Sequence, residues 1–153
     1  MEDELSALQK TSTWELVPLP AGKNLVGCKW VYKVKTHSDG SLERYKARLV
    51  AKGFSQEYGI DYEETFAPVA KMTTVRTLIS VAATRSWPLY QMDVKNAFLN
   101  GHLTEEVYMH PSPGLPHSSG HVCRLRHALY GLKQSPRDWY DRFQTAVTEL
   151  GFH

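Results

Sequence analysis

The stretch "CKWVYKVKTHSDGSLERYKARLVAKG", residues 28–53, constrains the fold more than any other part of the chain. On both sides of Asp39-Gly40, apolar and basic residues alternate with a period of two. This is the pattern of strands that have two different faces. An Asp-Gly pair between two such strands is a strong signal for a tight turn. The sequence therefore predicts an antiparallel β-hairpin.

The alternation gives the two faces of the predicted hairpin opposite characters. The apolar face is expected to carry Trp30, Tyr32, Val34, Tyr45, Ala47, Leu49 and Ala51. The basic face is expected to carry Lys29, Lys33, Lys35, Arg44, Lys46, Arg48 and Lys52. One interpretation of a lysine-rich face is that it has no partner and merely protects the edge of a sheet. However, residues 22–53 hold eight basic residues and two acids, a net charge of +6 in a chain of net charge +2. The remaining residues therefore carry −4, and this asymmetry indicates a polyanionic partner.

Size and composition are those of one globular domain. The chain has 153 residues, with four Trp, eight Tyr and five Phe to build a core. No apolar run approaches the roughly 18–20 residues that span a bilayer, and the N-terminal "MEDELSALQK" lacks the features of a secretory signal. Cys28 and Cys123 lie far apart without a Cys-x-x-Cys spacing. We therefore expect reduced thiols, an intracellular location and no membrane partner.

The final segment, "SPRDWYDRFQTAVTELG", gives the strongest helix prediction. Ser135 is expected at the N-cap, Pro136 at the first helical position and Gly151 at the C-terminal cap. Its apolar residues Trp139, Tyr140, Phe143, Val147 and Leu150 fall on one stripe. A second helix is predicted over 74–85, with Thr73 or Thr74 as N-cap and with core-facing Val75, Leu78, Ile79 and Ala82.

The other predicted elements are short. They are a helix within residues 2–10, extended segments at 13–20, 105–110 and 121–125, a strand ending near Val94, and a helical turn through Ala97-Phe98. Residues 56–71 are predicted to be an irregular connection. The sequence contains no repeats or low-complexity linkers. We therefore expect one α+β domain, an antiparallel sheet with packed helices.

One carboxylate in "LYQMDVKNAFLNG", residues 89–101, has no evident structural use. Asp93 lies where the predicted strand ends and a tight turn begins. An aspartate at such a position often starts a turn or caps a short helix. A carboxylate at a strand end can also hold a metal ion, and these residues alone leave both interpretations open.

Several common kinds of site find little support. His117, His121, Cys123 and His127 resemble a zinc cluster in composition, but their spacing fits no common zinc template. There is no Gly-x-x-x-x-Gly-Lys-Thr phosphate loop and no Gly-x-Gly-x-x-Gly motif. Nothing marks a nucleophilic serine. What remains is a basic hairpin, an acid at a strand end and the turn "LYGLKQSP" before a helix, in the order expected of a nucleotidyl transferase with a palm-like sheet.

The chain resembles the reverse transcriptase of copia-type retrotransposons. The resemblance rests on "TWELVPLPAGKNLVGCKWVYKVK", "DGSLERYKARLVAKGFSQEYGIDYEETFAPVAKMTTVR", "QMDVKNAFLNGHLTEEVYM" and "ALYGLKQSPRDWY". These motifs occur in the family's order and run from about Trp14 to the C-terminus. The resemblance implies an RNA-directed DNA polymerase that binds a template-primer of RNA or DNA, dNTPs and Mg²⁺.

The resemblance also implies roles for individual residues. Asp93 matches the first catalytic, metal-binding aspartate of the palm, and Val94 could offer its backbone carbonyl to the metal. Phe98 matches the aromatic gate that excludes the 2′ hydroxyl of ribonucleotides. Lys46 and Arg48 match the part of the fingers that contacts the triphosphate.

Tyr130 and Gly131 match the turn that lines the nucleotide pocket. Lys29, Lys33, Lys35, Arg44 and Lys52 are then candidates for nucleic-acid contacts. Phe98 and Tyr130 could equally be packing residues.

One part of the family pattern is missing. Family members complete the site with a Tyr-x-Asp-Asp hairpin, and these 153 residues contain no Asp-Asp pair. We therefore expect residues 1–153 to be a partial reverse transcriptase domain, comprising the fingers and the first part of the palm without the thumb or ribonuclease H. Such a fragment of a Pol polyprotein should be inactive alone, and would act in the cytoplasm, within a virus-like particle, or in the nucleus. The alternative is a catalytically dead remnant that binds nucleic acid or another partner.

Overall fold

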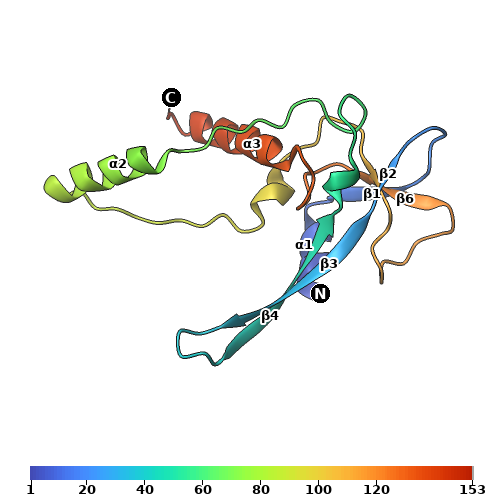
Figure 1. The fold of residues 1–153 in the computed structure, drawn as a ribbon, viewed down its shortest axis with the longest axis horizontal. Coiled ribbons are helices and arrows are strands. Elements are labelled where there is room, and N and C mark those ends of the chain that lie inside the picture. Colours follow the sequence, from blue (N-terminus) through green and yellow to red (C-terminus); the bar gives the residue numbers. More distant parts are fainter. Residues whose placement is uncertain (153) are drawn as a thin grey trace.

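The computed structural model describes residues 1–152. Its helices are α1 (Glu2–Lys10), α2 (Met72–Thr84) and α3 (Ser135–Glu149), with short 3-10 helices η1 (Gly53–Ser55) and η2 (Ala97–Asn100). Its strands are β1 (Trp14–Pro18), β2 (Leu25–Val26), β3 (Cys28–Thr36), β4 (Leu42–Ala51), β5 (Tyr108–Met109) and β6 (His121–Leu125). Figure 1 shows the β3–β4 hairpin projecting from one side of the strands, with α3 on another side.

The strands form two sheets. A four-stranded sheet has the order β1-β6-β5-β2, and β3 pairs with β4 in the second. The pairings β1–β6, β5–β6 and β3–β4 are antiparallel, whereas β2–β5 is parallel. The α+β class is therefore confirmed, although the larger sheet is mixed rather than wholly antiparallel. None of the helices among residues 1–152 is both long and apolar enough to cross a membrane.

The β3–β4 hairpin forms as predicted, and the structure supplies its register. Trp30 lies opposite Leu49, and Lys33 lies opposite Lys46. At the tip, Gly40 has a φ of +84°, and the Asp39 carboxylate accepts hydrogen bonds from the backbone and hydroxyl of Ser41. These two bonds lower the pKa of Asp39. The turn therefore forms through local contacts, as the Asp-Gly signal predicts.

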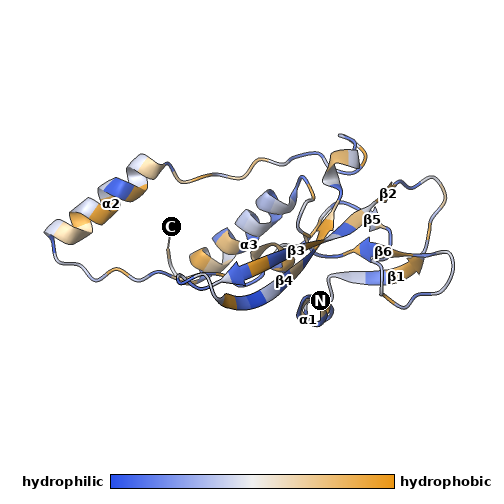
Figure 2. Cartoon of the chain, turned by 60° about the horizontal axis from the view of Figure 1, so that its bottom comes forward, coloured by the Kyte–Doolittle hydropathy of each residue, from blue (hydrophilic) through white to orange (hydrophobic). Residues whose placement is uncertain are grey.

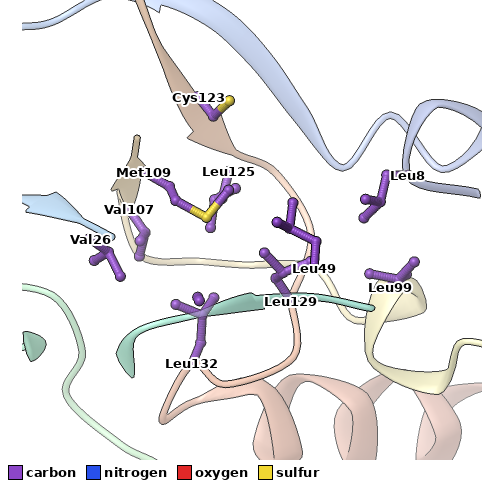
Figure 3. Packing of buried hydrophobic residues seen from close by; sticks show 11 residues of the cluster. Leu8, Val26, Leu49, Leu99, Val107, Met109, Cys123, Leu125, Leu129 and Leu132 are labelled. Atoms are coloured by element: carbon purple, nitrogen blue, oxygen red, sulfur yellow. The ribbon is translucent and has the colours of Figure 1, made fainter. Parts of the chain in front are cut away.

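The hydrophobic core lies where the hairpin, the larger sheet, α1 and η2 meet (Figure 3). Its buried members are Leu8, Val26, Leu49, Ala51, Leu99, Val107, Met109, Cys123, Leu125, Leu129 and Leu132. Leu49 and Ala51 bring the base of the hairpin into this core. The hairpin tip extends beyond it, so Tyr32 and Tyr45 of the apolar face are 67% and 77% exposed.

The prediction of a strand ending near Val94 is wrong. Residues 85–95 form no strand, and Asp93 and Val94 are exposed. No strand among the described residues pairs with this segment, and an extended chain becomes a strand only through a hydrogen-bonded neighbour. The 3-10 helix η2 confirms the predicted turn through Ala97-Phe98.

Helix α2 forms near its predicted place but is not packed in the core. Leu78 and Ile79 are 63% and 51% exposed, and Ala82 is the buried member of its apolar set. Figures 1 and 2 both show α2 at the far end of a long loop, and Figure 2 shows that several of its residues are hydrophobic. We call residues 65–104 the Asp93 loop. The sequence pattern predicted helix α2 correctly, but whether its apolar residues contact the core depends on which other segments lie nearby.

The predicted helix caps are also corrected. The N-cap position of α2 is Lys71, without a side-chain cap bond, rather than Thr73 or Thr74. The N-cap position of α3 is Gln134, and the Ser135 hydroxyl instead donates to the carbonyl of Leu129 at 2.6 Å. The C-terminal prediction fits, because Gly151 has a φ of +87° and its amide donates to Thr148. In the apolar stripe of α3, Phe143 and Leu150 are exposed.

Candidate functional site

The turn at Tyr130-Gly131 lies directly against the end of β4. The Ala51 amide donates to the Tyr130 carbonyl at 2.7 Å. Gly131 has a φ of +92°, and a Cβ added there would lie 2.2 Å from the Ala51 carbonyl oxygen. Only a residue without a side chain fits both this backbone conformation and this close approach. The glycine therefore lets the turn dock on the hairpin.

Three predicted nucleotide-binding residues meet at this turn. The Arg48 guanidinium lies over the Tyr130 ring, 4.7 Å from its centroid. The Phe98 ring meets the same tyrosine edge-on, with ring centroids 5.2 Å apart. Cation–π and edge-to-face contacts of this kind hold flat groups in a defined arrangement. Segments far apart in the sequence thus form one stack, which we call the Arg48–Tyr130–Phe98 stack.

The pKa of Tyr130 reflects its burial and the charges of three other side chains. Burial raises the pKa of Tyr130, the positive charge of Arg48 lowers it, and the carboxylates of Glu4 and Asp93 raise it further. Glu4 is buried at the free edge of β4, where it accepts a hydrogen bond from the Leu49 amide at 3.4 Å. Burial raises the pKa of Glu4, while Arg48 and Lys46 lower it. The net effect raises the pKa of Tyr130 above its usual range, so the phenol stays protonated at neutral pH.

The basic face of the hairpin begins beside this stack. Lys33 lies opposite Lys46, and Lys35 lies opposite Arg44, so like charges face each other across the strands. Burial lowers the pKa of Lys46, and so do Arg48, Arg44 and Lys35. Directly opposed like charges destabilise a sheet unless an anion lies between them. Lys29 is exposed and Lys52 is half-buried, with its stem against Gly27.

Asp93 does not lie in a preformed metal-binding site. Among residues 1–152, no three or more His, Cys, Asp or Glu side chains converge in a way that could hold a metal ion. Asp93 itself is exposed, as is Val94. Mg²⁺ requires near-octahedral oxygen coordination, and one exposed carboxylate supplies little of it. The residues described here therefore do not by themselves fit a Mg²⁺ site.

A buried amide network, which sequence reasoning missed, holds the other side of the turn. The Gln56 amide donates to Gln134 at 3.0 Å, and Gln134 donates to the carbonyl of Asp61 at 3.0 Å. Lys133 donates its backbone amide to Gln56 and its ammonium to the Tyr62 hydroxyl. Buried amides need such partners, so the network fixes residues 56–62 against the turn. No sequence signal pairs residues this far apart.

Comparison with known proteins gives a family. The family described as "Reverse transcriptase (RNA-dependent DNA polymerase)" matches residues 11–153. The Pol polyprotein of transposon RE2 from Arabidopsis thaliana is 52% identical over 155 residues, which cover 99% of this chain and 11% of the relative. That of transposon TNT 1-94 from Nicotiana tabacum is 50% identical over 147 residues, covering 95% of this chain and 11% of the relative.

A more distant match is the Gag-Pol polyprotein of transposon Ty1-ER2 from Saccharomyces cerevisiae. It is 30% identical over 156 residues, covering 93% of this chain and 8% of the relative. The chain thus spans about a tenth of the length of these curated relatives. No solved structure matches the chain significantly. The chain belongs to the reverse transcriptase family, and its sequence corresponds to the reverse transcriptase region of copia-type Pol polyproteins.

Proposed function

We propose that this chain supplies the fingers and the first part of the palm of a reverse transcriptase that extends DNA with dNTPs on an RNA or DNA template. The observation that carries the proposal is the Arg48–Tyr130–Phe98 stack, in which three of the predicted nucleotide-binding residues meet. The enzyme would act as part of a Pol polyprotein, in cytoplasmic virus-like particles or in the nucleus. Family membership and the long polyprotein relatives support this part of the proposal.

In this proposal the stack lines the nucleotide pocket. Arg48 and Lys46 face the triphosphate, because a guanidinium and an ammonium both neutralise phosphate oxygens. Tyr130 and Gly131 provide a flat floor against the base and sugar. Phe98 lies edge-on to Tyr130, where an aromatic ring would exclude a 2′ hydroxyl.

Asp93 is proposed as the first acid of the metal site, with the Val94 carbonyl beside it. In a complete enzyme, Asp93 and its partner carboxylates would hold Mg²⁺, which would supply charge stabilisation for phosphoryl transfer. The partner carboxylates are proposed to come from a Tyr-x-Asp-Asp hairpin outside these 153 residues. The chain alone should then bind nucleic acid without polymerising.

A second function, nucleic-acid binding without catalysis, is favoured by the opposed basic pairs of the hairpin. Lys33–Lys46 and Lys35–Arg44 have no acid directly across from them. The phosphates of a polyanion would relieve their repulsion. This binding is expected from the chain alone, whereas polymerisation requires the partner acids.

Binding to duplex DNA should weaken steeply as salt increases. If the hairpin makes roughly four phosphate contacts, log K should fall with log salt at a slope of about −3 to −4. Replacing Lys46 and Arg48 with Ala should flatten the slope by about one to two units, because each contact releases counterions. Fluorescence anisotropy with a labelled duplex at several salt concentrations measures this.

A matched control removes two charges elsewhere. Lys71 and Arg76 are exposed residues beside and within α2, away from the hairpin. Their double Ala variant should retain the wild-type slope within about half a unit, less than the loss of one contact. Equal flattening by both variants would show that the hairpin is not the binding surface.

Phe98→Ala should relax selection against ribonucleotides. The test protein is a chimera in which this chain replaces the matching region of the RE2 polyprotein. Removing the ring opens space for a 2′ hydroxyl, so discrimination should fall by roughly tenfold to a hundredfold, as for one small group in a steric pocket. The kcat/KM ratio for dNTP over rNTP measures it. Equal losses with both substrates would instead identify Phe98 as a packing residue.

A further inference from the structure

Arg137, near the start of α3, bonds to two distant segments of the chain and to its own neighbour in the helix. Its guanidinium donates to both carboxylate oxygens of Glu105, at 2.7 and 2.8 Å. It also donates to the Glu64 carbonyl at 2.7 Å and to the carboxylate of the adjacent Asp138. Its side chain is 14% exposed. Arg137 therefore uses its planar fork of donors almost completely.

Two of these partners lie at opposite ends of the Asp93 loop. Glu64 immediately precedes residue 65, and Glu105 immediately follows residue 104. Between them lie α2, Asp93 and Phe98. Closing such a long loop costs conformational entropy, and the irregular residues 85–95 have no strand pairing to oppose that cost. Arg137 bonds to both ends at once, and so closes the loop directly.

The returning end of the loop also packs closely on α3. A Cβ added at Gly101 would lie 2.8 Å from the Asp138 carbonyl carbon and 2.9 Å from the Trp139 nitrogen. The Gly101 carbonyl accepts a hydrogen bond from Ala128 at 2.9 Å. These contacts place η2, and with it Phe98, beside the turn that carries Tyr130.

The charges at Arg137 indicate that it positions the Asp93 loop rather than stabilises the fold as a whole. One guanidinium serves two carboxylates, and Asp138 Oδ2 is buried without a partner. Burial raises the pKa of Asp138 to about 6, although Arg137 opposes the shift. A buried ion pair is weak evidence for a gain in stability, and a gain in conformational specificity is the alternative that we adopt for Arg137.

We propose that Arg137 is a positioning residue that closes the Asp93 loop by joining Glu64 to Glu105, and thereby sets Phe98 against Tyr130. The closure follows from contacts within this chain. Its importance for nucleotide addition rests on the proposed function.

Amide hydrogen exchange followed by NMR tests the closure in the chain itself. In Arg137→Gln, the amides of Leu99 and Gly101, which donate to Asn96 and Phe98 within η2, should exchange at least about tenfold faster. The Leu125 amide, bonded to Val107 in the sheet, should keep its rate. Arg142→Gln, which removes an exposed arginine from the same helix, should change none of these rates.

Two further variants separate positioning from general destabilisation. Arg137→Lys should give intermediate rates at Leu99 and Gly101, because an ammonium cannot reproduce the paired bonds to Glu105. Glu105→Gln keeps the side-chain shape but removes the charge, and should accelerate exchange at the same two amides. It replaces Arg137→Gln in the test if Arg137→Gln fails to fold. Uniform acceleration that includes Leu125, or unchanged rates at Leu99 and Gly101, would overturn the proposal. Exchange requires no polymerase activity, so neither result decides the proposed function.

Discussion

Replacing Asp93 with Asn in the RE2 chimera should reduce dNTP incorporation by about a thousandfold or more, the loss expected when several kcal/mol of metal-based stabilisation disappear. Asn keeps the shape of the side chain but removes the negative charge that would hold a metal ion. The loss should therefore fall on kcat, with template-primer affinity nearly unchanged. Single-turnover incorporation and a separate binding titration measure the two quantities.

The isolated chain provides the complementary test. It should show no template-dependent incorporation with Mg²⁺ or Mn²⁺, and Asp93→Asn should change nothing measurable in it. The reason is the lack of convergent metal-binding groups among residues 1–152. Incorporation by the 153 residues alone, abolished by Asp93→Asn, would mean that other residues complete the site.

Asp141→Asn is the matched control in the chimera. Asp141 is an exposed acid on α3, and its replacement removes the same charge from the chain. Its activity should remain close to that of the unmodified chimera. If Asp93→Asn behaved like Asp141→Asn, Asp93 would be only the turn-forming residue that its local sequence also allows.

The hairpin could be predicted in detail because its information is local. Alternating residues and an Asp-Gly turn specify its faces, whereas the pairings of Trp30 with Leu49 and Lys33 with Lys46 come from the structure. The segment before Val94 has comparable apolar content but no local partner. A strand prediction there depends on a neighbour that the sequence pattern does not identify, and the structure contains none among residues 1–152.

In the candidate site, too, the sequence predicts individual residues but not the contacts between distant segments. Family resemblance pointed to Arg48, Phe98 and Tyr130 individually, but their stacking arises from the fold. The Gln56–Gln134 bond and the Arg137–Glu105 pair had no sequence signal at all. Both join segments far apart in the chain through single polar side chains, and periodicity or spacing cannot detect such contacts.

Gly131→Ala should be the most destabilising single-methyl change in the turn. Its φ of +92° is costly for any residue with a side chain, by about 1–2 kcal/mol. The new methyl would also lie 2.2 Å from the Ala51 carbonyl oxygen and 2.7 Å from Val50 Cγ1. The nearest of these atoms belongs to the β4 backbone, which leaves little room to move. We expect a total loss of about 3–5 kcal/mol in the free energy of unfolding, the upper range for single substitutions.

Alanine substitutions at two other glycines separate the two causes of this loss. Urea denaturation measures the free energy of unfolding of all three variants. Gly59 has a φ of +78° and open space around its Cβ position, so Gly59→Ala should show the conformational cost alone, about 1–2 kcal/mol. At Gly53 a Cβ would lie 2.0 Å from the Gly131 carbonyl oxygen, without a positive φ, so Gly53→Ala should show the packing cost alone. If Gly131→Ala lost no more stability than Gly59→Ala, the close docking of the turn on β4 would be wrong. The position assigned to Tyr130 beside Arg48 would then lose its support.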